Sequence, residues 1–177
     1  MKRTRYKYYT RMQLIIGVLL VVAVATGGTI AAVLYVQSRQ SGVISSSIQQ
    51  HIAFQIYAPI DTSAWAINRS SIAYNSSQGV LSLSVSSPTN TFVLEEQQTP
   101  DIFTNVSQYY PTLLSKLNVY GNFQTGLGTV ELTKPTELHG EQTAVLNSAG
   151  TLLFVRPKNN LTNGQWGTFF SSLVVTK

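Results

Sequence analysis

The sequence contains no cysteine and only two histidines among its 177 residues. The absence of cysteine excludes disulfide bonds, thiolate metal sites and cysteine nucleophiles. No Gly-x-Ser-x-Gly motif is present, and the glycine pairs are too short and badly placed for a phosphate-binding loop. We therefore expect no catalytic residues, no cofactor and no metal site, which together predict that the protein is not an enzyme.

Charged residues are also scarce, at 11% of the chain, and they are unevenly distributed. Five bases precede residue 12 with no acid among them, whereas the seven bases and seven acids beyond residue 37 cancel. The net charge of +5 thus resides in the N-terminal tail. A basic tail of this kind indicates how the chain is oriented in a membrane, and it gives no reason to expect nucleic-acid binding.

Leu14 to Val36 form an apolar run of 23 residues without a charge. A helix of this length is about 34 Å long, enough to cross a hydrocarbon core of about 30 Å. The five bases before the run, against Arg39 alone just after it, place the N-terminus in the cytoplasm. The alternative is a cleaved signal peptide, because Ala23-Val24-Ala25 resembles a cleavage site. The run continues for eleven residues past Ala25, which favours an uncleaved anchor.

Small residues recur within this run at intervals of four, at Ala23, Gly27 and Ala31. Such spacing lets two helices approach closely, which makes a homodimer through the membrane segment one hypothesis. The other is that small residues are simply common in membrane helices. The bilayer itself is in either case a predicted partner.

The chain thus divides into a cytoplasmic basic tail (1–13), a transmembrane helix (14–36), a Ser/Gln-rich linker (37–50) and an extracytoplasmic domain (51–177). The last part has roughly 125 residues, the usual size of one domain with one core. We therefore predict a single-pass protein of the cell membrane with type II topology.

The first half of the outer domain reads as strands. Residues 80–85 alternate strictly, with Leu81, Leu83 and Val85 on one face and polar or smaller side chains on the other. Further strands are predicted at 52–57, 65–74 and 91–98, with a hairpin loop at 75–79. The four strands predict an antiparallel meander.

The second half combines helices with more strands. Thr99 and Pro100 predict a helix start, and an apolar face from Ile102 to Leu117 predicts a helix that is kinked or divided at Pro111. Strands are then expected at 118–124, 128–133, 141–147 and 152–156, and a final amphipathic helix carries Trp166, Phe169, Phe170 and Leu173 on one stripe. This order predicts an α+β domain with an antiparallel sheet and packed helices.

Several aromatic segments resemble a known family. They are Phe54–Pro59, Trp65, Gly79–Leu83, Phe92–Gln97 and Phe169–Leu173. The pattern resembles uncharacterised bacterial single-pass membrane proteins with a domain of unknown function. The resemblance implies a Mog1/PsbP-like α/β/α sandwich and carries no activity with it. A LolA-like curved sheet that cradles lipid is the alternative fold.

Four aromatic residues are candidates for a ligand cleft between sheet and helix: Trp65, Tyr109, Tyr110 and Trp166. The other interpretation of these side chains is core packing. A hard cation at His139 with Glu137 and Glu141 is a weaker idea than a solvated turn, because no zinc or calcium spacing is present.

Glu95 and Glu96 are neighbours on a predicted strand and must therefore point to opposite faces. They cannot act as a carboxylate pair on one substrate. A buried carboxylate has a raised pKa and often marks a functional position, so either residue would be of interest if it were buried.

Three functions follow as hypotheses. The first is a membrane-tethered, non-enzymatic binding or accessory module for an extracytoplasmic protein, envelope component or apolar ligand. The second is a lipid or lipoprotein carrier, which needs an apolar cavity between sheet and helices. The third, and least supported, is an envelope enzyme that uses carboxylates such as Asp61, Glu95 or Glu141.

Overall fold

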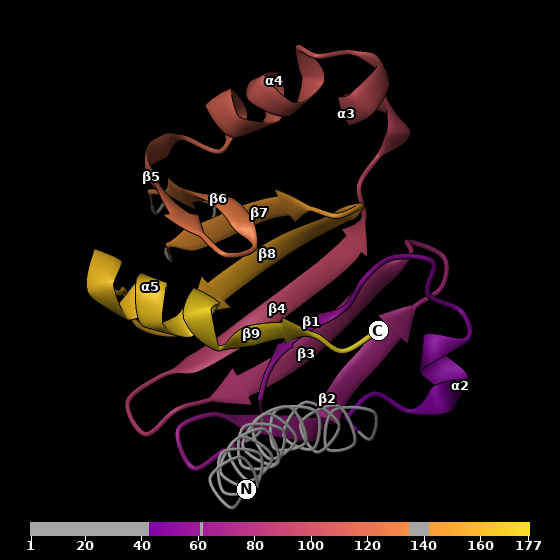
Figure 1. Ribbon diagram of the computed structural model, residues 1–177, viewed down its shortest axis with the longest axis vertical. Coiled ribbons are helices and arrows are strands. Elements are labelled where there is room, and N and C mark those ends of the chain that lie inside the picture. The colour runs from indigo at the N-terminus through magenta and orange to yellow at the C-terminus, as the bar shows by residue number, and fades with distance from the viewer. Residues whose placement is uncertain (1–42, 61, 135–141) are drawn as a thin grey trace, which may run out of the picture. The chain divides into compact units, whose positions relative to one another are not determined.

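The computed structural model describes residues 43–60, 62–134 and 142–177 (Figure 1). The strands are β1 (Tyr57–Pro59), β2 (Ala66–Asn75), β3 (Val80–Ser86), β4 (Thr91–Gln98), β5 (Val119–Thr125), β6 (Gly128–Thr133), β7 (Thr143–Ser148), β8 (Thr151–Pro157) and β9 (Leu173–Val175). The helices are α2 (Ser46–Gln49), α3 (Asp101–Asn105), α4 (Tyr109–Lys116) and α5 (Asn163–Ser172). The predicted α+β class with an antiparallel sheet is confirmed.

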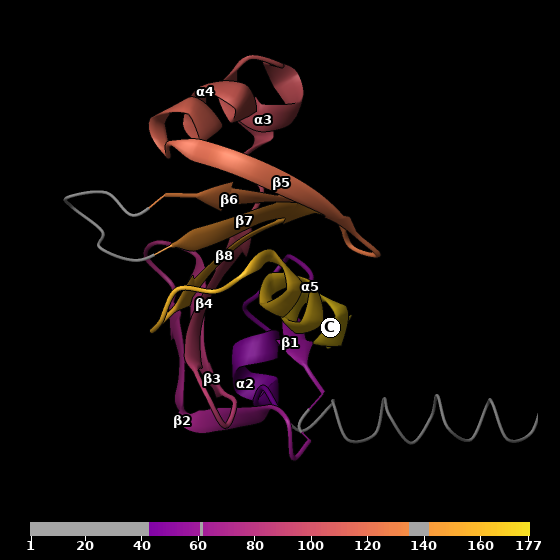
Figure 2. The same ribbon diagram turned by 90° about the vertical axis from the view of Figure 1, so that its left-hand side faces the viewer.

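The main sheet has seven strands in the order β2-β3-β4-β8-β7-β6-β5, and every neighbouring pair is antiparallel. Its inner face is covered by α5 and by the separate pair β1–β9 (Figures 1 and 2). At the β5–β6 end, α3 and α4 lie on the opposite side (Figure 2). Glu131 alternates with the buried residues Val130 and Leu132, so it points to this outer side, where its charge acts on Tyr110 of α4.

The alternation predicted for residues 80–85 is borne out in β3. Leu81, Leu83 and Val85 are at most 1% exposed, while the residues between them are half-buried on the outer face. Burial of each such side chain stabilises the fold by about 1.5–3 kcal/mol. The hairpin before β3 ends at Gly79, whose φ of +67° suits glycine.

The first predicted strand is wrong in both extent and partner. Residues 52–56 form no strand, although Ile52, Phe54 and Ile56 are buried. The strand is β1, which begins at Tyr57 and pairs with β9 instead of extending the meander. Its three residues are all buried because both of its faces are covered, so no alternation marks it in the sequence.

The predicted linker of residues 37–50 differs from the structure in its second half. Val43 and Ile44 are 6% and 1% exposed and belong to the hydrophobic core. The short helix α2 follows them, and the side-chain amide of Gln49 donates to the carbonyl of Ile44 at 3.1 Å. The packed domain therefore begins at least eight residues before residue 51. The composition did not indicate this boundary, because the two buried apolar residues lie within a segment that is mostly Ser and Gln.

The region after β4 forms two helices, which confirms the predicted division in preference to a kink. The break lies at Val106–Gln108 and not at Pro111. Pro111 lies in the first turn of α4, where no backbone donor is required. The helix cap also differs: Pro100 is the N-cap, and the Thr99 hydroxyl donates to the Asn147 side chain at 2.6 Å.

The amphipathic stripe predicted at the C-terminus is confirmed in α5. Trp166, Phe169 and Phe170 are at most 1% exposed. A reciprocal capping box starts the helix, because the Thr162 hydroxyl accepts from the Gln165 backbone N–H while the Gln165 side chain accepts from the Thr162 N–H. Leu173 is buried as predicted, but it belongs to β9.

Within the described ranges, no helix combines the length and the apolar character needed to cross a membrane. The predicted span Leu14–Val36 lies outside the described residues, and so do Ala23, Gly27 and Ala31. The transmembrane helix and its self-association therefore stay predictions from the sequence.

Candidate functional site

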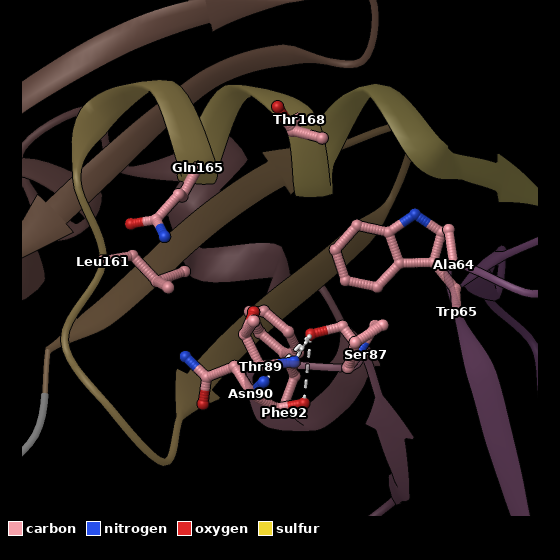
Figure 3. A pocket seen from close by; sticks show the side chains of 10 residues that line it. Ala64, Trp65, Ser87, Thr89, Asn90, Phe92, Leu161, Gln165 and Thr168 are labelled. Atoms are coloured by element: carbon pink, nitrogen blue, oxygen red, sulfur yellow. Dashed lines mark hydrogen bonds between the residues drawn. The ribbon is translucent and has the colours of Figure 1, made fainter.

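A pocket of about 250 Å³ opens between the N-terminal half of α5 and the loops that precede β2 and β4 (Figure 3). It is lined by Ala64, Trp65, Ser87, Pro88, Thr89, Asn90, Phe92, Leu161, Gln165 and Thr168. The lining comes from three chain segments that are far apart in sequence. The pocket is therefore a product of the tertiary fold and not of one loop.

Aromatic rings form the inner end of the pocket. The Trp65 ring meets Phe92 edge-on at a centroid distance of 5.6 Å and Phe169 at 5.3 Å. Phe92 and Phe169 stack at 4.3 Å with 12° between their planes. Because Phe92 and Phe169 are both at most 2% exposed, this end of the pocket is part of the rigid core.

Asn90 fixes the wall formed by the loop before β4. Its side-chain amide donates to the Asn159 carbonyl at 2.8 Å, and its side-chain oxygen accepts from the backbone N–H groups of Asn159 and Thr91 at 3.1 and 2.9 Å. The Ser87 N–H donates to the Asn90 carbonyl at 2.8 Å and closes the turn. Since Asn90 is only 8% exposed, these bonds hold the wall in one conformation.

The opposite wall belongs to α5 and its cap. The side-chain oxygen of Gln165 is engaged in the capping box with Thr162, and the Thr168 hydroxyl donates to the Gly164 carbonyl at 3.0 Å. The Gln165 side-chain NH₂ donates to no other described residue and points toward Leu161 at the pocket (Figure 3). This places one fixed hydrogen-bond donor at the rim of the pocket, beside the other polar side chains of its lining.

The chemistry of the pocket follows from its composition. None of its ten lining residues is Asp, Glu, His, Lys or Arg. It therefore offers no general acid, no general base and no counter-charge for an ionic ligand. It offers apolar and aromatic contact area with polar groups at the rim, which is how proteins orient small uncharged ligands.

The structure does not bring the four predicted cleft residues together. Trp65 lines the pocket, whereas Trp166 is 0% exposed in the core next to Phe170. Tyr109 and Tyr110 lie on α4, on the outer side of the sheet, and Tyr109 is 49% exposed. The Tyr110 ring packs against Phe103 at a centroid distance of 5.5 Å. Burial of the Tyr110 hydroxyl, and to a smaller extent the negative charge of Glu131, raise its pKa to about 12.

The prediction that Glu95 and Glu96 point to opposite faces is confirmed. Glu95 lies on the outer face and forms an ion pair with Arg156 on β8. Glu96 is 0% exposed on the inner face. Desolvation by this burial raises the pKa of Glu96 well above its usual range, and a hydrogen bond from the Tyr57 backbone lowers it by less.

Two further predicted groups lie beyond the described residues. Asp61, Glu137, His139 and Glu141 fall in positions 61 and 135–141. In the part of the chain that the structure describes, no three His, Asp or Glu side chains come together in a way that could hold a metal ion.

Comparison with protein-family models, curated proteins and solved structures finds no significant match for this chain. The site must therefore be interpreted from its own geometry. Sequence reasoning singled out Trp65 but missed Asn90, Gln165 and Thr168. Of these, Gln165 could have been placed at a helix start, because a threonine three residues before a glutamine, as in Thr162-Asn163-Gly164-Gln165, is typical of a capping box.

Proposed function

We propose that the protein is a membrane-tethered, non-enzymatic binding module whose pocket at Trp65 accepts an uncharged apolar or aromatic group. The observation that carries this proposal is the preformed pocket itself, with aromatic rings at its inner end, no charged residue in its lining and a wall fixed by Asn90. Preformed apolar sites with few polar groups are the usual form of a binding site.

The size of the pocket supports an anchoring role. A volume of about 250 Å³ accommodates a group of about eight to ten non-hydrogen atoms, if each takes about 25–30 Å³. At about 0.5 kcal/mol per atom, such a group alone binds with about 4–5 kcal/mol, which corresponds to a Kd of about 1 mM. We infer that the pocket holds one side chain or ring of a larger extracytoplasmic partner, whose remaining contacts supply affinity.

The tether rests on the sequence. The uncharged run Leu14–Val36 and the five bases before it support a single membrane span with the N-terminus in the cytoplasm. The packed domain then lies outside, joined to the span by the few residues before Val43. This arrangement holds the pocket near the outer face of the membrane.

The alternatives have less support. A LolA-like carrier needs open space between sheet and helix, but Trp166, Phe169 and Phe170 fill that space as close-packed rings. Helices on both sides of the sheet favour a sandwich of the Mog1/PsbP-like kind over a lipid cradle. An enzyme based on Glu95 is disfavoured because Arg156 neutralises that carboxylate on the outer face.

Two-dimensional NMR of the full-length chain, labelled with ¹⁵N-tryptophan and placed in lipid nanodiscs, tests the proposal. The chain has only two tryptophans, so two indole signals are expected. Titration with benzamide should move the Trp65 signal along a saturable curve with a Kd in the millimolar range. Trp166 is buried and does not line the pocket, and its signal serves as the internal reference.

Charge and site controls sharpen this experiment. Benzoate and benzylammonium have nearly the same shape as benzamide but carry a charge, and both should bind several-fold more weakly. Thr168→Phe should fill the pocket and abolish the benzamide response, whereas Tyr109→Ala, which removes an exposed ring on α4, should leave it intact. Equal responses to all three probes, or none that saturates, would contradict an uncharged binding pocket.

A further inference from the structure

Glu96 occupies a position in the core that its chemistry does not favour. It follows Phe92 and Leu94 on the inner face of β4, and all three are at most 2% exposed. Its direct neighbours in the sheet are Leu81 on β3 and Leu153 on β8, both 0% exposed. An apolar residue would suit this environment, so the carboxyl group requires a separate explanation.

The carboxyl group is only half satisfied. The backbone N–H of Tyr57 donates to its Oε2 atom at 2.9 Å, and its Oε1 atom is buried without a hydrogen-bond partner in the described part of the chain. An ionised carboxylate would need several donors or a positive charge to offset burial. The geometry therefore suits a neutral, protonated Glu96 that accepts one hydrogen bond.

No described charge lies opposite Glu96 to hold it in the ionised form. The groups that face it are Leu81 and Leu153 in the sheet and Tyr57 on β1, and the Tyr57 hydroxyl donates to Gln55 and to the Ser148 carbonyl. The charged groups of the neighbouring elements are engaged elsewhere. Glu95 and Arg156 pair on the outer face, and the Lys177 ammonium binds the Gln49 and Ile52 carbonyls.

The strand that covers Glu96 has few backbone partners, although its side chains are buried. β1 has three residues and pairs only with β9, which also has three. Isolated two-stranded pairs are marginal on their own, so β1–β9 depends on its contacts with the main sheet. The polar contacts between this region and the main sheet are the Tyr57–Glu96 hydrogen bond, the bond from the Tyr57 hydroxyl to the Ser148 carbonyl at 3.4 Å, and the bond from the Thr151 hydroxyl to the Gln55 carbonyl at 2.7 Å.

We propose that Glu96 is a proton-operated latch, which seats β1 and β9 on the main sheet when protonated and releases them when it ionises. Release would let water reach both carboxylate oxygens, and it breaks fewer strand contacts than any opening within the seven-stranded sheet. It would also free two of the three segments that line the pocket, because β1 leads into Ala64–Trp65 and β9 follows α5, while the Asn90 wall stays in place. The latch itself does not depend on the pocket binding a ligand.

The direction of the pH dependence follows from proton linkage. The folded state raises the pKa of Glu96 above the value of about 4.3 in an unfolded chain. Between these two values the native state binds a proton that the unfolded state has lost, so stability falls as pH rises. The stabilisation is complete below about pH 4, and each pH unit inside the window raises the unfolding equilibrium constant up to about tenfold.

Urea unfolding of the full-length chain in dodecyl maltoside, followed by tryptophan fluorescence between pH 4 and 8, measures this effect. Glu96→Gln keeps the shape and stays neutral, so it should remove the Glu96 part of the slope and be more stable than wild type at pH 8. Glu95→Gln is the matched control on the next residue and should keep the wild-type slope. Equal slopes for wild type and Glu96→Gln would overturn the latch.

Hydrogen exchange on the wild-type chain provides a test that needs no variant. The protection factor of the Tyr57 amide, corrected for the intrinsic pH dependence of exchange, should fall by tenfold or more from pH 4 to pH 8. The Val130 amide in the main sheet should lose much less. A Tyr57 protection factor that stays constant, or one that falls in parallel with Val130, would show that β1 is not released separately.

Discussion

Phe169→Ala is the substitution that should most directly expose how α5 is held on the sheet. Phe169 is 0% exposed and contacts three other aromatic rings, those of Phe92, Trp65 and Phe170. Truncation removes the ring and leaves a cavity bordered by groups that are themselves fixed. It also removes the support behind the pocket, because Trp65 and Phe92 both rest on this ring.

The expected loss is about 3–5 kcal/mol, the usual cost of truncating a buried phenylalanine to alanine. A domain of roughly 130 residues has a free energy of unfolding of about 7–20 kcal/mol, so the variant should still fold. With an m-value of about 2 kcal/mol per molar urea, the unfolding midpoint should fall by about 1.5–2.5 M.

Urea unfolding monitored by tryptophan fluorescence measures this shift. Tyr109→Ala is the matched control, since Tyr109 is also aromatic and helical but is 49% exposed. Its midpoint should change by no more than about 0.5 M. A midpoint for Phe169→Ala within 0.5 M of wild type would refute the idea that α5 is seated by this ring cluster.

Two smaller predictions concern the pocket wall and a hairpin. Asn90→Ala removes three hydrogen bonds of a buried amide, so it should lower the free energy of unfolding by about 1–3 kcal/mol and weaken benzamide binding in the NMR titration. Gly150→Ala should cost about 1–2 kcal/mol in a thermal melt, because Gly150 has a φ of +81° between β7 and β8. Gly164→Ala in α5, where no atom lies within 4 Å of the added methyl group, should be neutral or stabilising and serves as its control.

Local patterns predicted the elements whose partners are near in sequence. β3 followed from strict alternation, and α5 followed from its apolar stripe. β1 and β9 could not be predicted in this way, because each has three residues and takes its partner from the other end of the chain. Leu173 fitted the helical stripe as well as it fits a strand, and only the pairing with Pro59 decides between the two.

The burial of Glu96 could be predicted from the sequence, whereas the pocket could not, because its residues come from distant segments. The sequence places Glu96 two residues after Leu94 and four after Phe92, which is the signal that it, and not Glu95, points into the core. The pocket has no such signal. Trp65, Asn90 and Gln165 meet there because three distant segments fold together, and no single segment contains a recognisable binding motif.

The pairing of β1 with β9 has a consequence for how the protein folds during its synthesis. Thr176 bonds to the Ile56 carbonyl from 120 residues further along the chain, and Lys177 reaches back to the start of the domain. A chain emerging from the ribosome can pair β2, β3 and β4 early, but it cannot complete the β1–β9 pair until Leu173–Val175 have also emerged. Until β9 pairs with β1, Glu96 stays open to water, so this late long-range pairing is also the step that removes a charge from solvent.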